Sequence, residues 1–216
     1  MSTPPGARTA PRTEHSPRPH LELRRPSVES EQLCSGISQL IAEVTLDGGA
    51  IGYVTPPTRD ETDAWLGAVL ADVRAGDAGF VVAAADGQVA GCGLWQRRGA
   101  VPTYRHSAEL RQIMTHPAAR GLGLGAAIVS GLLEDARSAG LELLTLGVRG
   151  NNQAAIELYS GLGFREWGRL PGGIAVGDER FDDVKMWLPL GDLRPSGRDD
   201  LRPSGQDVRA LSGPDV

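Results

Sequence analysis

The sequence predicts one α/β (α+β) domain, with a mixed central β-sheet of about seven strands and helices on both faces. Four segments carry apolar residues at helical spacing, and these alternate with shorter apolar segments typical of strands. An Asp-Gly pair at 86–87 joins two apolar runs, as in a β-hairpin. A glycine-rich turn at 120–125 links a strand to a helix. The predicted order is β-α-α-β-β-β-α-β-α-β-β.

Composition places this domain at about 20–190, between two polar tails. Residues 1–19 are rich in Pro, Ser, Thr and Arg and lack apolar periodicity. At the other end, DLRPSGRD (192–199) is followed directly by DLRPSGQD (200–207), a tandem polar repeat. Neither end carries enough apolar side chains to offset the entropy of ordering. We therefore expect disordered tails at 1–19 and 191–216.

The first half of the domain predicts two helices before the hairpin. A strand over 20–27 ends at Pro26, and Gly and Pro residues predict a loop between the two helices. The predicted elements are strand 20–27, helix 30–44, loop 47–60, helix 61–76 and hairpin 80–97.

The second half alternates strands and helices. Its first helix repeats apolar residues every four positions, and Gly140 lies just past its end, as a C-cap should. The next strand is so rich in leucine that we expect burial on both of its faces. Asn151 can cap the helix after it. The predicted elements are strand 107–117, helix 124–139, strand 141–148, helix 151–164 and strands 165–170 and 179–190.

Charge and hydropathy limit the partners that we expect. The formal net charge of −5 argues against nucleic acid. No apolar run reaches the roughly 20 residues of a membrane span, and the N-terminus has no apolar core of a secretory signal. We expect a cytoplasmic protein without a membrane partner. Cys34 and Cys92 are too few for a disulfide framework and have no metal-site spacing, so we expect two buried thiols and no metal.

The RGLGLG turn (120–125) predicts an anion site. The first N–H groups of a helix lack intrahelical acceptors, and glycines let a phosphate approach them closely. Ala126-Ala127 stand where a Walker A loop needs Lys-Ser/Thr, and the spacing differs from the Rossmann fingerprint. The turn alone leaves open a second interpretation, in which the glycines serve tight helix–sheet packing.

Two motifs resemble the GNAT superfamily of acyl-CoA-dependent N-acyltransferases. The first is Arg/Gln-x-x-Gly-x-Gly/Ala, matched by Arg120, Gly123 and Gly125. The second is Asn-x-x-Ala-x-x-Leu-Tyr-x-x-x-Gly-Phe, which is matched by Asn152, Ala155, Leu158, Tyr159, Gly163 and Phe164. The resemblance covers about 20–190 and implies the GNAT fold, whose element order agrees with the one predicted above. Dimerisation is common in that family, so a homodimer is compatible with the resemblance.

The resemblance also implies where acetyl-CoA, the acyl donor, would bind. Backbone N–H groups of the loop would hold the pyrophosphate of coenzyme A, and the preceding strand would pair with the pantetheine arm because it bulges and splays from the next strand. Asn152 would bind the same arm, and its alternative role is a helix cap. The implied donor-binding residues are Ile113, Met114, Thr115, Arg120, Gly121, Leu122, Gly123, Leu124, Gly125, Ala126 and Asn152.

Two side chains are implied in catalysis. Tyr159 is the candidate general acid, protonating or hydrogen-bonding the departing thiolate. Its alternative role is packing on a helix face. Glu109 is the candidate base, acting on the amine directly or through water, because many family members carry a glutamate there. A purely structural glutamate remains the alternative.

The resemblance implies the chemical class of the acceptor amine but not its identity. Ribosomal-protein N-terminal acetyltransferases usually carry a glutamate five residues before the motif asparagine, where this chain has Gly147. The tabtoxin-resistance acetyltransferases are similar over more of the chain, which implies a small primary amine such as an amino-acid-like antimetabolite or antibiotic. A peptide or protein acceptor, a longer acyl donor and a non-catalytic acyl-CoA-binding module stay open.

Residues 45–60 and 171–182 would wall the acceptor site. The second segment and the residue that follows it carry acidic side chains that would favour a cationic amine, or are simply solvated. These residues are Asp178, Glu179, Asp182 and Asp183. His106 and His116, beside the predicted cleft, are interpreted as incidental.

Overall fold

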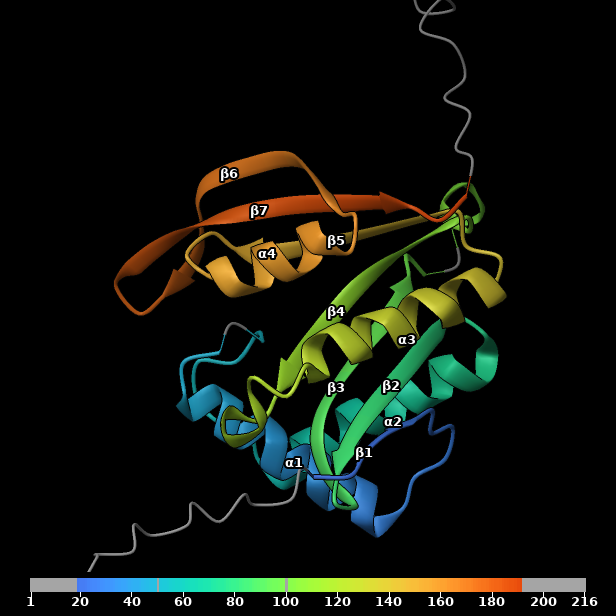
Figure 1. The fold of residues 1–216 in the computed structure, drawn as a ribbon, viewed down its shortest axis with the longest axis vertical. Coiled ribbons are helices and arrows are strands. Elements are labelled where there is room, and N and C mark those ends of the chain that lie inside the picture. Colours follow the sequence, from blue (N-terminus) through green and yellow to red (C-terminus); the bar gives the residue numbers. More distant parts are fainter. Residues whose placement is uncertain (1–18, 50, 100, 192–216) are drawn as a thin grey trace, which may run out of the picture.

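The computed structural model describes residues 19–49, 51–99 and 101–191 (Figure 1). Within them the chain forms four α-helices: α1 (Glu31–Leu46), α2 (Arg59–Ala75), α3 (Leu124–Ser138) and α4 (Gln153–Gly161). The strands are β1 (Leu21–Arg24), β2 (Ala78–Ala85), β3 (Gln88–Arg97), β4 (Ser107–Thr115), β5 (Leu143–Arg149), β6 (Arg165–Val176) and β7 (Glu179–Pro189). The element order is the predicted one. The predicted tails, apart from residues 19 and 191, lie outside the described residues.

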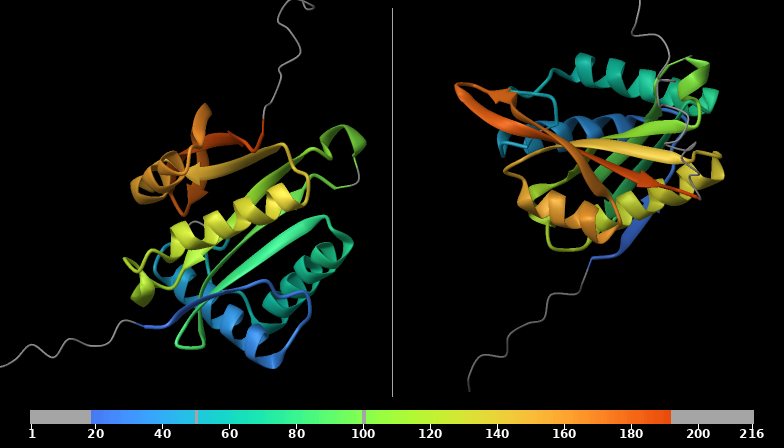
Figure 2. Two further views of the ribbon diagram at one scale, coloured as in Figure 1. Left: turned by 45° about the vertical axis from the view of Figure 1, so that its right-hand side comes forward. Right: turned by 90° about the horizontal axis from the view of Figure 1, so that it is seen from above.

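All seven strands form one mixed sheet in the order β1-β2-β3-β4-β5-β7-β6. Every neighbouring pair is antiparallel except β4 and β5, which run parallel. Seen from above in Figure 2, α1 and α2 lie on one side of the sheet and α3 and α4 on the other. The predicted fold class is therefore confirmed. Among the described residues, no helix is both long and apolar enough to span a bilayer.

Two apolar clusters hold the helices to the sheet. One joins α3 and α4 to the five strands β2, β3, β4, β5 and β7 and includes the fully buried Ile128, Leu132 and Leu144. The other joins α1 and α2 to β2, β3 and the end of β4, with Ile37, Leu66 and Phe80 at its centre. The second cluster contains no residue of β5 or β7. The α1/α2 face of those two strands is therefore left open, and the functional site borders on it.

The hairpin between β2 and β3 turns at the predicted pair. Asp86 and Gly87 both have positive φ, at 48° and 82°. Two successive residues with positive φ are typical of a type I′ turn, whose twist matches the twist of the flanking strands.

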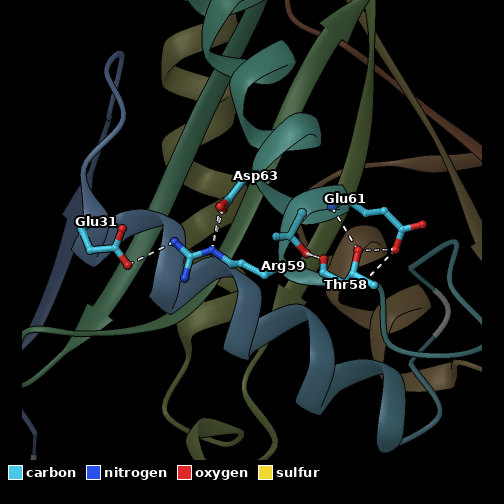
Figure 3. Close-up of polar contacts among 6 residues, drawn as sticks. Glu31, Thr58, Arg59, Glu61 and Asp63 are labelled. Atoms are coloured by element: carbon cyan, nitrogen blue, oxygen red, sulfur yellow. Dashed lines mark hydrogen bonds and ion pairs between the residues drawn. The ribbon is translucent and has the colours of Figure 1, made fainter.

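The start of α2 is fixed by polar contacts that the residue patterns alone did not specify (Figure 3). Thr58 and Glu61 form a capping box, in which each side chain accepts the other residue's backbone N–H. Arg59 donates to Asp63 one turn further along and to Glu31 of α1 at 3.2 Å. These contacts anchor the end of the loop that leaves α1 and lies beside the functional site.

β4 and β5 separate after four paired residues. The parallel register runs from Ser107 opposite Leu143 to Leu110 opposite Leu146. On the other side of β4 the register with β3 shifts, and Gln112 within the shift has a φ of 48°. Such a bulge bends a strand and disrupts its ladder locally. Figure 1 shows the two strands diverging toward the N-terminus of α3, as the resemblance implied.

The sequence patterns were wrong about the faces of β5. We expected burial on both faces, but the strand alternates: Leu144, Leu146 and Val148 are buried, whereas Leu143 is half-buried and Gly147 exposed. The physical reason is that α1 and α2 pack over β2 and β3 and leave this part of the sheet uncovered. β6 also extends to residue 176, six residues past its predicted end.

Candidate functional site

A cavity of about 740 Å³ lies where β4 and β5 separate. Its walls come from four places: the end of α1 with the following loop, the last residues of β4, the turn before α3, and the end of β5 with α4. These segments are far apart in the chain and are brought together by the splayed strands. The volume is within the range of small-molecule and cofactor sites.

The N-terminus of α3 has no side-chain cap. α1, α2 and α4 are capped by Ser30, Thr58 and Asn152, but the N-cap of α3 is Gly123, which cannot supply one. The first backbone bond into this helix runs from Ala127 N to the carbonyl of Gly123, so the three N–H groups before it have no intrahelical acceptor. Together with the helix dipole, these donors could bind an anion that enters the cavity.

The glycines of the turn differ in their surroundings. Gly121 and Gly123 have φ values of 81° and 78°, and a Cβ built on either would meet no atom within 4 Å. These two glycines give the turn its left-handed backbone and leave the space beside it empty. A Cβ on Gly125 would lie 3.2 Å from Leu158 Cδ2, so this glycine serves the close packing of α3 on α4.

Ten of the eleven predicted donor-binding residues line the cavity. The exception is Leu122, whose side chain is exposed on the outside of the turn. The ten residues are Ile113, Met114, Thr115, Arg120, Gly121, Gly123, Leu124, Gly125, Ala126 and Asn152. The edge of β4 that carries the first three does not pair with β5, so its backbone groups are available to a ligand.

Arg120 is not a free cation at the rim. Its Nη1 lies 2.6 Å from the Asp47 carboxylate, in the loop after α1. His116, interpreted from sequence as incidental, makes a second link between the same segments: its Nε2 contacts the Glu43 carboxylate, while its Nδ1 accepts the Ala118 N–H at 3.1 Å. The turn is thereby tied to the end of α1 and to the residue that follows it by the Arg120–Asp47 ion pair and the His116–Glu43 contact.

Asn152 caps α4, and Asn151, which we expected to do so, does not. The side-chain oxygen of Asn152 accepts the N–H of Ala155 at 3.2 Å. Its amide N–H groups are not used by this bond. Because the residue also lines the cavity, it can cap the helix and donate to a ligand at the same time.

Tyr159 lies in the wall of the cavity, on α4. Only 7% of its surface is exposed, and its ring packs edge-on against Phe164 with ring centroids 5.9 Å apart. Burial disfavours the phenolate and raises the pKa of Tyr159 to about 12. The side chain is therefore a neutral hydrogen-bond donor at physiological pH.

Glu109 does not line the cavity. It is half-buried on β4, opposite Gln96 of β3 and Thr145 of β5, in the stretch where all three strands are still paired. Its neighbours along β4, Ala108 and Leu110, are buried toward α3, so by strand alternation Glu109 faces the α1/α2 side.

The acidic residues near 171–182 are partly neutralised by local cations. Asp182 lies 3.4 Å from Arg169, and Asp183 lies 2.8 Å from Nζ of Lys185. The second pair stands over Gly147: a Cβ there would come within 2.9 Å of the Lys185 ammonium. The space of a glutamate at this position is thus occupied by an ion pair.

Residue patterns missed two charged residues of the cavity, Asp47 and Arg149. Asp47 falls in the loop that was expected to wall the acceptor site, but nothing in its local sequence indicates a pairing with Arg120. Arg149 lies three residues before the motif asparagine, and its position at the end of β5 was the available signal. Across the described part of the chain, no three His, Cys, Asp or Glu side chains are grouped as metal ligands would be.

The residues present fit an acyl-CoA. The uncapped N-terminus of α3 suits a pyrophosphate, and the unpaired edge of β4 suits the amide groups of a pantetheine arm. Both border the same cavity, next to the Tyr159 phenol.

Comparison with known proteins agrees with this geometry. The model of the acetyltransferase (GNAT) family matches residues 39–164. L-amino acid N-acyltransferase MnaT of Escherichia coli is 27% identical over 140 residues, which are 64% of this chain and 77% of that protein. An L-methionine sulfoximine/L-methionine sulfone acetyltransferase of Pseudomonas aeruginosa is 30% identical over 142 residues, 63% of this chain and 77% of that protein.

Among solved structures, a GNAT superfamily phosphinothricin acetyltransferase from Sinorhizobium meliloti, in complex with acetyl-CoA, superimposes with a TM-score of 0.68. The match covers 79% of this chain and 89% of that one at 24% identity, so it supports the fold assignment alone.

Proposed function

Because the chain belongs to the GNAT acetyltransferase family and is an acetyl-CoA-dependent acyltransferase, we propose that it acetylates the primary amine of a small, amino-acid-like molecule. The observation that carries the proposal is the one cavity that both the uncapped N-terminus of α3 and Tyr159 line. The cavity thus holds a candidate site for the donor's phosphates and a hydrogen-bond donor for its sulfur. Acetyl-CoA supplies the activated acetyl thioester.

The protein's contribution on the donor side is to hold acetyl-CoA in a fixed position. The free N–H groups of Leu124, Gly125 and Ala126 would hold the pyrophosphate, with Arg120 at the rim. The unpaired edge of β4 at Ile113–Thr115 would fix the pantetheine arm, and Asn152 would donate to it. Fixing a reactant at several points lowers the entropic part of the barrier.

Tyr159 would stabilise the departing thiolate by hydrogen bonding. A phenol with a pKa of about 12 is a weaker acid than an ordinary thiol, whose pKa is about 8.5. Complete proton transfer to the sulfur is therefore uphill, whereas a hydrogen bond from a buried phenol is favourable. The phenol stays protonated over the working pH range and is always ready to donate.

Glu109 would accept the proton that the attacking amine loses. Its place on the α1/α2 face of β4 is on the side of the predicted acceptor walls, and water can bridge it to a substrate. Because the residue stands outside the cavity wall, we assign it the water-mediated form of the role.

The names of the relatives favour a small acceptor. The Escherichia coli relative is named for L-amino acids, and the Pseudomonas aeruginosa relative for L-methionine sulfoximine and sulfone. The ion pair over Gly147 argues against the alternative acceptor, a peptide N-terminus, because it occupies the place of the base that ribosomal-protein acetyltransferases usually carry.

The proposal is tested by thiol release from acetyl-CoA with a panel of amines: amino acids, methionine sulfoximine and sulfone, aminoglycosides, polyamines and short peptides. We expect release with amino-acid-like amines and an acetylated product in the mass spectrum. Release with peptides alone would contradict the small-amine proposal. Acetyl-CoA binding without release from any amine would favour the non-catalytic module. The protein's own thiols should add little background, since Cys34 and Cys92 are buried and burial raises the pKa of both.

A further inference from the structure

We propose that Arg149 binds the carboxylate of the acceptor, and that the preferred acceptors are consequently α-amino acids rather than amines in general. This inference rests on the proposed function and adds a residue that recognises the substrate. The evidence comes from the position of Arg149, from its two contacts and from the hydrogen-bonding capacity that those contacts leave unused.

Arg149 is the last residue of β5 and lies on its open face. Side chains alternate along the strand, and Leu144, Leu146 and Val148 point into the core beneath α3 and α4. Arg149 therefore projects to the α1/α2 side, where the sheet is uncovered. Arg149 lines the cavity from the end of β5, whereas the glycine-rich turn lines it from the N-terminus of α3.

The side chain contacts both segments that the resemblance assigns to the acceptor walls. Its Nη2 donates to the carbonyl of Gly48 at 3.2 Å, in the loop after α1. Its guanidinium lies over the ring of Phe181 in β7, 4.9 Å from the centroid. A cation–π contact and a hydrogen bond hold the guanidinium plane in one orientation, which favours specific recognition over a diffuse charge effect.

These contacts leave hydrogen-bonding capacity unused. The Nε of Arg149 is buried without a hydrogen-bond partner among the described residues. A buried donor without a partner is unfavourable, and a ligand oxygen that reaches it with a small shift of the side chain would remove that cost. An arginine offers donors on two edges, and a carboxylate can bridge two of them at once.

Arg149 is also the uncompensated charge of the cavity. Of the described side chains in its wall, Asp47, Arg120 and Arg149 are charged, and the first two form an ion pair with each other. No carboxylate lies within ion-pair distance of Arg149 in the part of the chain that the structure describes. Asp183 is opposite Arg149 in the β5–β7 register, but its carboxylate is paired with Lys185 at 2.8 Å. An anionic group entering the acceptor side is therefore attracted to Arg149.

Two other roles make different predictions. If Arg149 held a phosphate of the donor, its replacement would weaken acetyl-CoA binding for every acceptor alike. If it only braced Gly48 against Phe181, its replacement would lower stability and affect charged and uncharged acceptors equally. Binding of the acceptor's carboxylate alone makes the loss depend on that carboxylate.

The experiment compares α-amino acids with their carboxamides, which keep the side chain and a primary α-amine but lack the negative charge of the carboxylate. We expect wild type to acetylate at least one amino acid with a kcat/KM at least tenfold higher than that of its carboxamide. Arg149→Gln should lower kcat/KM for the acid 10- to 100-fold, mostly through KM, and for the carboxamide less than threefold. The KM for acetyl-CoA should stay within twofold. Arg149→Lys should recover part of the loss, because it restores charge without the planar fork.

Arg111→Gln is the matched control, since Arg111 is exposed on β4, donates to Gln96 and lies outside the cavity. It removes the same charge and should leave the ratio of acid to carboxamide unchanged. Equal losses for acid and carboxamide in Arg149→Gln, or a wild type that does not distinguish the two, would overturn the carboxylate assignment while leaving the acetyltransferase proposal intact. Failure of wild type to acetylate any amine would instead remove the proposed function, and this inference with it. The melting temperature of each variant shows whether it is folded.

Discussion

The carboxylate of Asp47 lies 2.6 Å from Nη1 of Arg120, so the loop that follows α1 neutralises the cation beside the anion-binding turn. A phosphate at the N-terminus of α3 must share Arg120 with this carboxylate. The same bond joins the donor side of the cavity to the loop that walls the acceptor side. We therefore expect donor binding to be coupled to the position of that loop.

Asp47→Asn should strengthen acetyl-CoA binding. Both partners are about half exposed, so the effect is small: exposed pairs contribute about 0.2–1 kcal/mol, which is up to about fivefold in Kd. The gain should shrink as salt is added, because screening weakens the competition. Titration calorimetry at two salt concentrations measures it. Asp60→Asn, an equal charge change on the exposed surface of α2, should leave Kd unchanged, and weaker binding by Asp47→Asn would refute the competition.

Gly123→Glu should abolish acetyl-CoA binding. The substitution places bulk and negative charge in the open space beside the free N–H groups, and it forces a side chain onto a φ of 78°. Gly76 is a suitable control, since it has a φ of 75°, equally open surroundings and a position at the end of α2 away from the cavity. Gly76→Glu and Gly123→Glu should lose similar stability, about 1–2 kcal/mol. Binding by Gly123→Glu with a wild-type Kd would show that the phosphates bind elsewhere.

Tyr159→Phe should lower kcat without weakening acetyl-CoA binding. Removing the phenol removes a hydrogen bond that forms fully only as the sulfur becomes negative, which lowers the rate of the chemical step by about 10²-fold. The ring keeps its contact with Phe164. Single-turnover acetyl transfer, measured beside the equilibrium Kd, separates the two effects. A single-turnover rate equal to that of wild type would exclude Tyr159 from the chemistry.

The buried phenol should also appear in alkaline unfolding. The pKa of Tyr159 is about 12 in the folded chain and about 10 in the unfolded chain. Between these values the unfolded state loses a proton that the folded state keeps, so stability is fully present below pH 10 and falls as the pH rises to 12. The fall amounts to about 3 kcal/mol. Urea unfolding at pH 8 and pH 11 should show a smaller loss for Tyr159→Phe than for wild type, and identical losses would mean that the phenol is solvated.

Glu109→Gln should reduce the rate most at low pH. There the amine is largely protonated and must lose a proton before it attacks, whereas at high pH only the proton released after attack needs an acceptor, and hydroxide or buffer can take it. The pH profile of kcat/KM for the amine should therefore steepen on its acidic limb. Glu142→Gln, an exposed glutamate ahead of β5, is the control. A profile parallel to that of wild type at every pH would assign Glu109 a structural role only.

Local patterns predicted the element order and the Asp86–Gly87 turn, and two local motifs carried the resemblance that implied the donor-binding residues. Each depends on neighbouring residues: a helical period, a turn dipeptide, or a glycine-rich turn before a helix. Leu122 was included because it belongs to the motif, but on a turn with alternating backbone conformations its side chain points outward.

Contacts between distant segments could not be predicted in this way. Arg149 meets Gly48 and Phe181 only because β5 ends beside the loop after α1 and beside β7. The exposed face of β5 likewise depends on where α1 and α2 pack, and the leucines of that strand carry no information about it. The same holds for Glu109. The resemblance implies a base at this position in the sequence, but the distance between its carboxylate and the substrate depends on the whole acceptor site.

The most direct test of acetyl transfer to an amino-acid-like amine is kcat/KM for an α-amino acid and for its carboxamide, measured with acetyl-CoA on the wild-type protein and confirmed by the mass of the product. We predict an N-acetylated product, with the acid preferred at least tenfold. Acetyl-CoA binding with no acetylated product from any amine would contradict the enzymatic assignment.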